Sequence, residues 1–143
     1  MSGSAIQTSF RPDVFDATAC RLLGMACGDC GLVSFPARDS CPSCGSPENL
    51  EQRVLSRDGR VCSWAVVRNA PPGLLTPYVL AYVDLEEDGV RVMSRLEDVE
   101  PEALRVGMPV ELTSLSVVST RADDDVPDSV DVHMFAFRPV EHP

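Results

Sequence analysis

Residues 27–45 read CGDCGLVSFPARDSCPSCG, and this stretch decides the first part of the fold. It holds two Cys-x-x-Cys pairs, Cys27 with Cys30 and Cys41 with Cys44, and a glycine follows each pair. Such a turn places two thiolates on one side of the chain, and the glycine lets backbone N–H groups point at the sulfurs. Two facing turns supply four sulfur atoms in a tetrahedron, which is the geometry of a closed structural Zn²⁺ site. The spacing therefore predicts a zinc ribbon whose ligands are these four cysteines.

Two other uses of the four cysteines stay open. By spacing alone, the same cage of sulfurs is also suited to iron. Two disulfides would require an oxidising compartment, but residues 1–19 have neither the basic start nor the apolar centre of a secretory signal. We therefore favour zinc and expect a cytoplasmic location.

The chain divides into three predicted segments. Residues 1–20 form an N-terminal segment that we expect to be partly disordered or to hold a short helix. The ribbon covers residues 21–50 and is too short to bury a core, so it should depend on its metal. Residues 51–143 are long enough for one compact β domain. No apolar run reaches the roughly 18 residues of a membrane-spanning helix.

The charge of the chain weighs against one common function of zinc ribbons. Its net charge of −10 is made up of −1 on residues 1–60 (six Arg against seven acidic residues) and −9 on residues 61–143 (six Arg against fifteen). Lysine is absent from the sequence. Nucleic-acid-binding proteins gain affinity by neutralising phosphates with Lys and Arg. The charge therefore argues against a nucleic-acid partner.

The second part of the sequence alternates in the manner of β-strands. Apolar, β-branched and aromatic residues predict five strands, over residues 59–68, 78–85, 90–96, 110–118 and 130–137. Residues 86–89 predict a hairpin turn, and residues 98–104 predict one helical turn with Asp98 as its N-cap. Five strands with a short helix between the third and fourth is the element order of an OB-fold barrel. The sequence thus predicts a mainly β protein, with a zinc ribbon followed by a five-stranded OB-fold barrel.

Several motifs beyond the cysteines resemble one known family. They are RLLG at 21–24, FPAR at 35–38, GRVCSW at 59–64, APPG at 70–73, PYV at 77–79 and LRVGMPV at 104–110. In this order, and together with the two cysteine pairs, they resemble the DUF35 family, in which a rubredoxin-like zinc ribbon precedes an OB-fold. The resemblance extends over residues 21–139, and it implies that the four cysteines bind structural zinc.

The resemblance also implies a function. Members of this family act as non-catalytic accessory subunits in acyl-CoA-processing or polyketide-type acyltransferase complexes. The expected partner is a thiolase-like or ketosynthase-like protein, or else a hydratase-like or aldolase-like one, and the barrel would help to shape its acyl-CoA channel. A hetero-oligomer is therefore expected, with acyl-CoA or another acyl substrate at the shared interface.

Six residues are candidate contacts for a substrate or a partner. Trp64 lies in the middle of a predicted strand, where it either fills the barrel or lines an acyl chain. Arg68 either pairs with a CoA phosphate or is solvated at the end of that strand. The stiff turn that follows presents leucines to a partner protein. The full candidate set is Trp64, Arg68, Pro72, Gly73, Leu74 and Tyr78.

The remaining reactive side chains carry no predicted chemistry. Cys20 and Cys62 are expected to be small buried residues, and His133 and His142 have no nucleophile motif to serve. The acidic run 123–125 is expected to be a solvated loop, because it lacks the spacing of a calcium-binding loop. No catalytic residue is therefore predicted. The alternative function is a nucleic-acid-binding OB-fold with structural zinc, and an independent enzyme ranks third.

Overall fold

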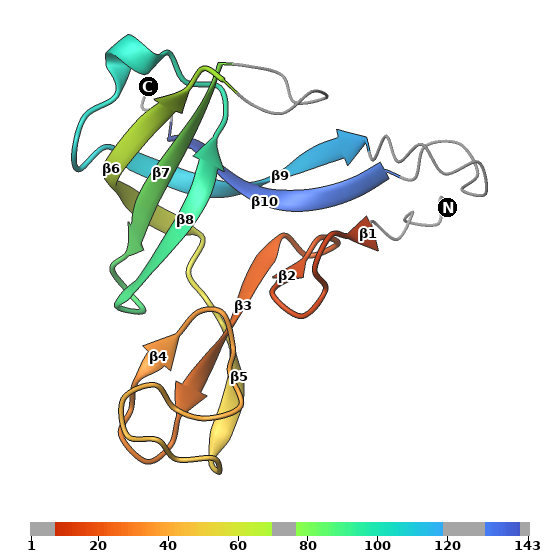
Figure 1. Ribbon diagram of the computed structural model, residues 1–143, viewed down its shortest axis with the longest axis vertical. Coiled ribbons are helices and arrows are strands. Elements are labelled where there is room, and N and C mark those ends of the chain that lie inside the picture. The colour runs from red at the N-terminus through yellow and green to blue at the C-terminus, as the bar shows by residue number, and fades with distance from the viewer. Residues whose placement is uncertain (1–7, 70–76, 119–130, 141–143) are drawn as a thin grey trace.

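The computed structural model describes residues 8–69, 77–118 and 131–140. In these ranges the regular structure consists of ten strands and one short 3₁₀ helix. None of the described residues belongs to a helix long and apolar enough to cross a membrane. The strands form a small sheet that carries the cysteines and a barrel, and Figure 1 shows the small sheet below the barrel. The predicted mainly β fold is confirmed.

The small sheet, here called the ribbon sheet, is built around β3 (Arg21–Cys27). This strand pairs in antiparallel fashion with β2 (Phe15–Asp16), β4 (Val33–Ser34) and β5 (Leu50–Val54). A side chain at Gly24 would place its Cβ 2.7 Å from the carbonyl oxygen of Ser34, so glycine is needed for this close approach. Residues 51–54, which the pattern assigned to the barrel domain, pair with β3 and extend the ribbon sheet.

The barrel is formed by β6 (Asp58–Val67), β7 (Tyr78–Leu85), β8 (Val90–Leu96), β9 (Pro109–Val118) and β10 (Asp131–Pro139). Their pairing order β6–β7–β8–β10–β9–β6 closes on itself. Alternate side chains point into the barrel because the period of a strand is two residues. On β7 the buried set is Val79, Ala81, Val83 and Leu85. The predicted five-stranded OB-fold barrel is confirmed.

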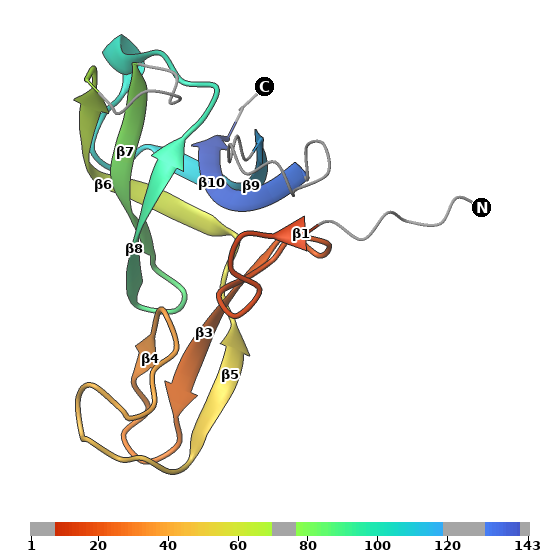
Figure 2. The same ribbon diagram turned by 45° about the vertical axis from the view of Figure 1, so that its right-hand side comes forward.

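The hairpin of β9 and β10 extends beyond the barrel. β9 pairs with β6 only over its first three residues, and β10 pairs with β8 only at Phe137. The two strands nevertheless pair with each other along residues 110–118 of β9. A short strand near the N-terminus, β1 (Thr8–Ser9), pairs in parallel with β10 at Val132 and His133. Figures 1 and 2 both show β1 beside the projecting half of the hairpin.

One hydrophobic core joins the base of the ribbon sheet to the barrel. Phe15 and Leu22 of the ribbon sheet are fully buried in the same cluster as the barrel residues. The ring of Phe135 on β10 lies 6.0 Å from that of Phe10, 6.1 Å from that of Phe15 and 5.9 Å from that of Phe35. Tilted and edge-to-face rings at such distances attract each other. These four phenylalanines, here called the aromatic junction, therefore connect the N-terminal segment, the ribbon and the barrel.

A polar contact makes a second connection between the two sheets. The turn between β7 and β8 forms as predicted, with Gly89 in the left-handed region at φ 69°. Asp88 in this turn has a side chain only 4% exposed, which pairs with Arg53 of β5 at 3.0 Å. It also accepts a hydrogen bond from the N–H of Ser56 at 2.6 Å. The turn thus holds the segment through which the chain passes from the ribbon to the barrel.

The helix expected within residues 1–20 is not formed in the described part of that segment. Val14 and Phe15 both donate to the carbonyl oxygen of Arg11, which gives a single turn, and the chain then enters β2. Burial of Phe15 in the core favours this extended path over local helix formation. Partial disorder was expected within residues 1–20. Residues 1–7 lie outside the described ranges, whereas β1 and β2 pair with the barrel and with the ribbon sheet.

Asp98 does not cap a helix, contrary to the prediction. It adopts a left-handed φ of 56°, and the 3₁₀ helix η1 (Pro101–Ala103) begins after Glu100 without a side-chain cap. The helix starts at Pro101, whose ring restricts φ to a helical value. Proline rather than aspartate therefore marks the start of this helix.

Replacing Phe135 with alanine should lower the free energy of unfolding by about 3 kcal/mol, because it leaves a cavity where four rings meet. Denaturant unfolding followed by circular dichroism measures the change. Val106→Ala is the matched control, since that side chain is 72% exposed. Equal stability of Phe135→Ala and the unmodified chain would show that the aromatic junction does not hold the ribbon to the barrel.

Candidate metal centre

The four cysteines lie in two turns that face each other at the end of the ribbon sheet. Cys27 ends β3, and Cys30 follows it in the first turn. Cys41 and Cys44 lie in the second turn, which comes after β4. Cys27 and Cys41 are buried, whereas Cys30 and Cys44 are exposed. Each turn therefore supplies one inner and one outer sulfur.

Both turns close through the same hydrogen bond. The N–H of Gly31 donates to the carbonyl oxygen of Cys27 at 2.8 Å, and the N–H of Gly45 donates to that of Cys41 at 2.9 Å. The two glycines have φ values of 81° and 77°, which residues with side chains rarely adopt. The glycine after each cysteine pair is thus required by the backbone of the turn.

The spacing of the sulfur atoms fits a tetrahedral metal ion. All four Sγ atoms lie within 4.8 Å of one another, with Cys27 3.7 Å from Cys44 and Cys30 3.5 Å from Cys41. A disulfide requires about 2.05 Å, so the four residues are thiols, contrary to the alternative of two disulfides. Four sulfurs bound to one Zn²⁺ at about 2.3 Å would lie about 3.8 Å apart.

The electrostatics of the cluster also favour a cation. The N–H groups of Cys44 and Ser43 donate to the Sγ of Cys41, and they lower the pKa of Cys41 to about 6. At Cys44 a hydrogen bond from the N–H of Ser46 also lowers the pKa. Burial and the neighbouring thiols outweigh it and raise the pKa of Cys44 to about 12. One sulfur therefore ionises readily, and its neighbours oppose further ionisation. A cation among the sulfurs would allow all four to bind as thiolates.

Asp29 joins the two turns through side-chain hydrogen bonds. It accepts from the hydroxyl of Ser46 at 2.5 Å and from the amide of Asn49 at 2.9 Å, and these bonds lower the pKa of Asp29. The N–H of Gly28 beside it donates to the carbonyl oxygen of Asn49 at 2.8 Å. Sequence reasoning did not single out Asp29, because its partners lie in the other half of the ribbon.

The structure separates the predicted contact residues. Trp64 is half-buried against the core and borders a shallow depression of about 230 Å³. Tyr78 borders a different depression of about 310 Å³, where the guanidinium of Arg95 lies 4.8 Å from the centre of its ring. Arg68 is exposed just beyond the end of β6. Pro72, Gly73 and Leu74 lie outside the described residues, as do His142 and the acidic run 123–125.

The exposed apolar residues near Trp64 were missed by the sequence analysis. Tyr82 is 47% exposed and Met93 is 57% exposed, and the two lie opposite each other on β7 and β8. Leu80 and Ala65 are the next opposed pair on the same face. Strict alternation along β7 was the available signal, because it places Tyr78, Leu80 and Tyr82 together on the outside.

The other cysteines and one histidine have definite environments. Cys20 and Cys62 are half-buried rather than buried, and burial raises the pKa of Cys20. The hydroxyl of Ser114 lies 3.1 Å from Nδ1 of His133, a pairing across the hairpin that the sequence did not reveal. No described carboxylate forms a hydrogen bond with His133, so the described residues do not include a third group of the kind that orients a catalytic histidine.

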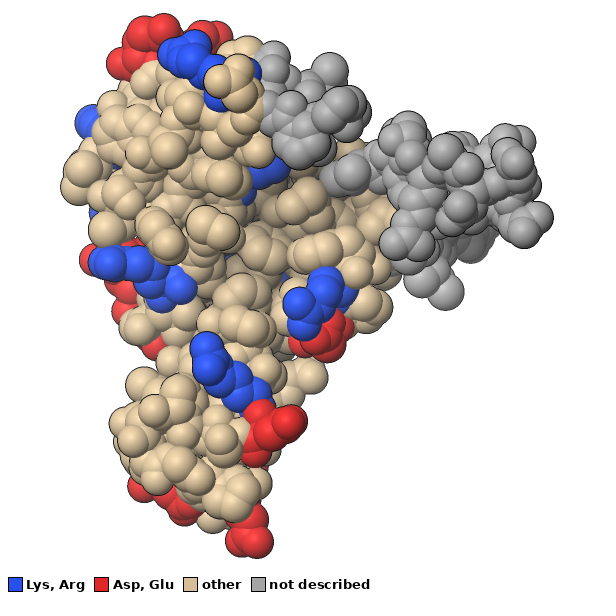
Figure 3. All heavy atoms as spheres, viewed as in Figure 1, with Lys and Arg blue, Asp and Glu red and all other residues tan. Residues whose placement is uncertain are grey.

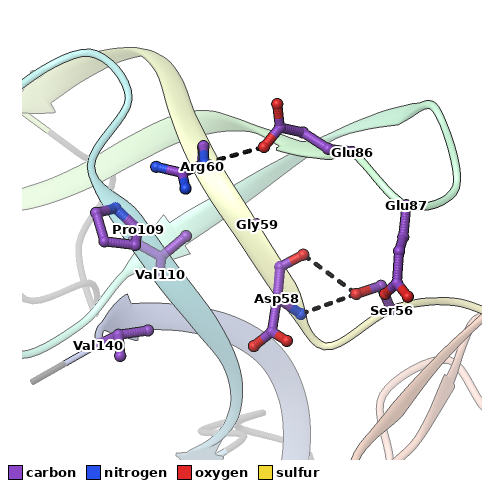
Figure 4. Close-up of a pocket in the computed structure, with 9 residues that line it drawn as sticks. All are labelled: Ser56, Asp58, Gly59, Arg60, Glu86, Glu87, Pro109, Val110 and Val140. Carbon is purple, nitrogen blue, oxygen red and sulfur yellow. Dashed lines mark hydrogen bonds and ion pairs between the residues drawn. The ribbon is translucent and has the colours of Figure 1, made fainter.

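A hollow of about 420 Å³ lies where the ribbon sheet meets the barrel (Figure 4). Its walls include the carboxylates of Asp58, Glu86 and Glu87, and its one guanidinium, that of Arg60, pairs with Glu86 at 2.9 Å. The excess of negative charge makes this hollow a poor site for the phosphates of a nucleotide or of CoA. It therefore does not provide a second candidate site for an anionic substrate.

Replacing Cys44 with serine should remove the bound metal and unfold the ribbon sheet, because metal affinity is part of the folding free energy of such a site. Elemental analysis for zinc and iron, together with the charge-transfer absorption of the cobalt-substituted chain, measures the loss. Cys62→Ser, which changes a cysteine on β6 outside the cluster, should retain one metal per chain. Full metal content in Cys44→Ser would contradict a four-cysteine site.

Asp29→Ala should lower metal affinity about tenfold, because it removes two hydrogen bonds to a charged group that hold the two turns together. Competition with a chromophoric chelator measures the affinity. Asp39→Ala is the matched control, since Asp39 is an exposed carboxylate of the same ribbon. An equal effect of the two substitutions would mean that net charge, not the link between the turns, sets the affinity.

Comparisons with known proteins cover both parts of the chain. The model described as the ChsH2 rubredoxin-like zinc ribbon domain matches residues 19–51, and that described as the ChsH2 C-terminal OB-fold domain matches residues 52–114. A DUF35 domain-containing scaffold protein of Methanocaldococcus jannaschii is 37% identical over 123 residues, which is 85% of this chain and 83% of that protein.

Two further relatives are parts of enzymes. Benzoylsuccinyl-CoA thiolase subunit BbsA of Thauera aromatica is 37% identical over 124 residues, which cover 84% of this chain and 83% of that subunit. The solved structure of the Ltp2-ChsH2(DUF35) aldolase contains a chain with a TM-score of 0.66 and 31% identity, over 86% of this chain and 87% of that one. The chain therefore belongs to the DUF35/ChsH2 family of proteins with a rubredoxin-like zinc ribbon and an OB-fold domain.

Proposed function

We propose that the chain is a non-catalytic accessory subunit of an acyl-CoA-processing complex, and that its four cysteines bind one structural Zn²⁺. Its partner is a thiolase-like enzyme, or else a hydratase-like or aldolase-like one, and the barrel helps to shape the partner's acyl-CoA channel. The observation that carries this proposal is the likeness to BbsA over most of both chains. The likeness to the DUF35 chain of an aldolase points in the same direction.

The chemistry of the metal centre supports a structural role. Four thiolates complete the coordination of a tetrahedral ion and leave no position for water or substrate. The centre lies at the far end of the ribbon sheet from the barrel (Figure 2). The contribution of Cys27, Cys30, Cys41 and Cys44 is thus to hold the ribbon in shape for assembly.

The outer face of β6, β7 and β8 supports docking on another protein. Tyr82, Met93, Leu80 and Ala65 form an apolar surface there, and Figure 3 shows few charged side chains on this face. Ion pairs border it, with Asp84 and Arg91 2.7 Å apart beyond Tyr82, and Arg95 and Glu97 3.4 Å apart beside Leu80. An apolar centre with a charged rim is the usual anatomy of a protein interface. We call these four residues the apolar face.

Charge determines how the two subunits would share an acyl-CoA. The chain carries −10, and a Zn²⁺ with four thiolates adds −2, so it should not bind the phosphates of CoA strongly alone. The partner would supply most of the positive charge. Trp64 remains our candidate for a contact with the acyl or pantetheine chain, and Arg68 for a contact with a CoA phosphate. Pro72, Gly73 and Leu74 of the following turn remain candidates for contacts with the partner protein, and Tyr78 for a contact with the substrate or the partner.

Affinity purification of the tagged chain from its native cells tests the proposal. Near-stoichiometric recovery of a thiolase-like, hydratase-like or aldolase-like protein would support it and would name the class of reaction. Recovery of RNA-associated proteins, together with binding of single-stranded oligonucleotides at low salt, would overturn it in favour of a nucleic-acid-binding module.

Tyr82→Ala should weaken binding to the recovered enzyme about tenfold, because truncating an aromatic residue at the centre of an interface removes much of its contact energy. Calorimetric or surface-based titration measures the dissociation constant. Val106→Ala removes an even more exposed apolar side chain outside the apolar face (72% against 47% for Tyr82) and should leave the constant unchanged. Unchanged affinity in Tyr82→Ala would place the interface away from the apolar face.

A further inference from the structure

Along the second part of strand β9, one edge is not paired with any residue that the structure describes. β6 covers this edge only over residues 109–111, and the N–H of Leu112 then donates to the carbonyl oxygen of Arg57 at 2.8 Å. From residue 113 to residue 118 no described residue pairs with this edge, whereas the opposite edge pairs with β10 throughout. In Figure 1 this half of β9 continues past β6 with β10 along one side. Six residues of strand span about 20 Å.

The backbone groups on this edge point outward in a regular pattern. In an antiparallel pair, the N–H and C=O of every second residue point away from the partner strand. The N–H of Leu112 points to this edge, so the backbone groups of Ser114, Ser116 and Val118 do as well. A row of donors and acceptors in this arrangement is a template for a further strand.

This edge lacks the features that usually prevent pairing. Natural edge strands are kept short or carry charges, prolines or bulges. Three other strands follow this rule, since β1 and β4 have two residues each and β5 carries Glu51 and Arg53. Residues 113–118 read TSLSVV and contain no charge, proline or glycine, and Ser116 is exposed. The free half of β9 is therefore suited to accept another strand.

We propose that the free edge of β9 binds an extended strand of the partner enzyme, with basic residues at the ends of that strand. The identity of the occupant rests on the proposed function above. Main-chain hydrogen bonds would provide the affinity, and the alternating side chains of the incoming strand would provide the specificity.

Charge distinguishes this occupant from a second copy of the chain. Each copy carries −10, and −9 of this charge lies on residues 61–143. Two such chains repel each other, whereas a strand with Lys or Arg at its ends is attracted. Edge-to-edge pairing between two copies is therefore disfavoured relative to pairing with a basic partner.

Backbone hydrogen exchange of the full, metal-loaded chain tests the edge directly. Amides of Ser114, Ser116 and Val118 should exchange rapidly in the free chain, while those of Thr113, Leu115 and Val117, which face β10, should be protected. The probe is the peptide Lys-Val-Thr-Val-Thr-Val-Lys, with Glu-Val-Thr-Val-Thr-Val-Glu as its matched control. The basic peptide should slow the outward amides about tenfold at millimolar concentration, and the acidic one should have a much smaller effect.

A pair of substitutions links the effect to the outward backbone. Ser116→Pro removes one outward N–H, a change that edge strands tolerate, while Ser116→Ala keeps it. Ser116→Pro should lose the protection by the basic peptide, and it should bind the co-purified enzyme about tenfold more weakly than Ser116→Ala does. Circular dichroism and metal content show whether both variants are folded. If either variant does not fold, the exchange measurement on the unmodified chain still tests the edge.

Three results would overturn the proposal. They are no protection by either peptide, protection in the free chain that rises with its concentration, and protection in the free chain at every concentration. The second result would assign the edge to another copy of the chain, and the third would assign it to the chain itself. Failure of the affinity purification would instead contradict the proposed function, and the peptide experiment would still decide whether the edge accepts a strand.

Discussion

The architecture depends on the way in which strand β10 uses its two edges. One edge pairs with β9 along the whole hairpin, and the other is divided between β8 at Phe137 and β1 at Val132 and His133. The barrel closes with only part of each hairpin strand, so the remaining part projects beyond it. On the projecting part β10 is covered by β1, while β9 is not covered by a described residue. The hairpin is longer than the part that closes the barrel, and this excess length leaves the edge of β9 open.

The two ends of the ribbon sheet are stabilised in different ways. At its base, Phe15 and Leu22 belong to the core of the barrel, and Asp88 holds the connecting segment. At its far end the buried side chains are few, and Cys27 and Cys41 are among them. A segment with so little buried apolar surface needs a cross-link or a metal to remain folded. The base of the ribbon sheet therefore stays folded as long as the barrel does, whereas folding of its far end depends on a metal bound by the sulfur cluster.

Features encoded by neighbouring residues could be predicted, and those formed by distant residues could not. Cysteine spacing and two-residue alternation are local patterns, so the four sulfurs, the five strands and the turn at Gly89 were all foreseen. Asp29 meets partners from the other turn, and Asp88 meets β5, so no local pattern identifies either. A short helix was one expectation for residues 1–20, but the burial of Phe15 against Phe135 imposes an extended backbone there. These three misses reflect tertiary contacts that override or supplement a local preference.

The pairing of β1 with β10 has a consequence for how the chain folds during synthesis. Thr8 lies opposite Val132, so β1 leaves the ribosome long before the strand with which it pairs. The contacts of the ribbon sheet are local by comparison, and they can form as soon as β5 has emerged. Contacts between residues far apart in sequence form slowly because a long loop must close first. The N-terminal segment must therefore wait, unpaired, until the last strand of the barrel has been made.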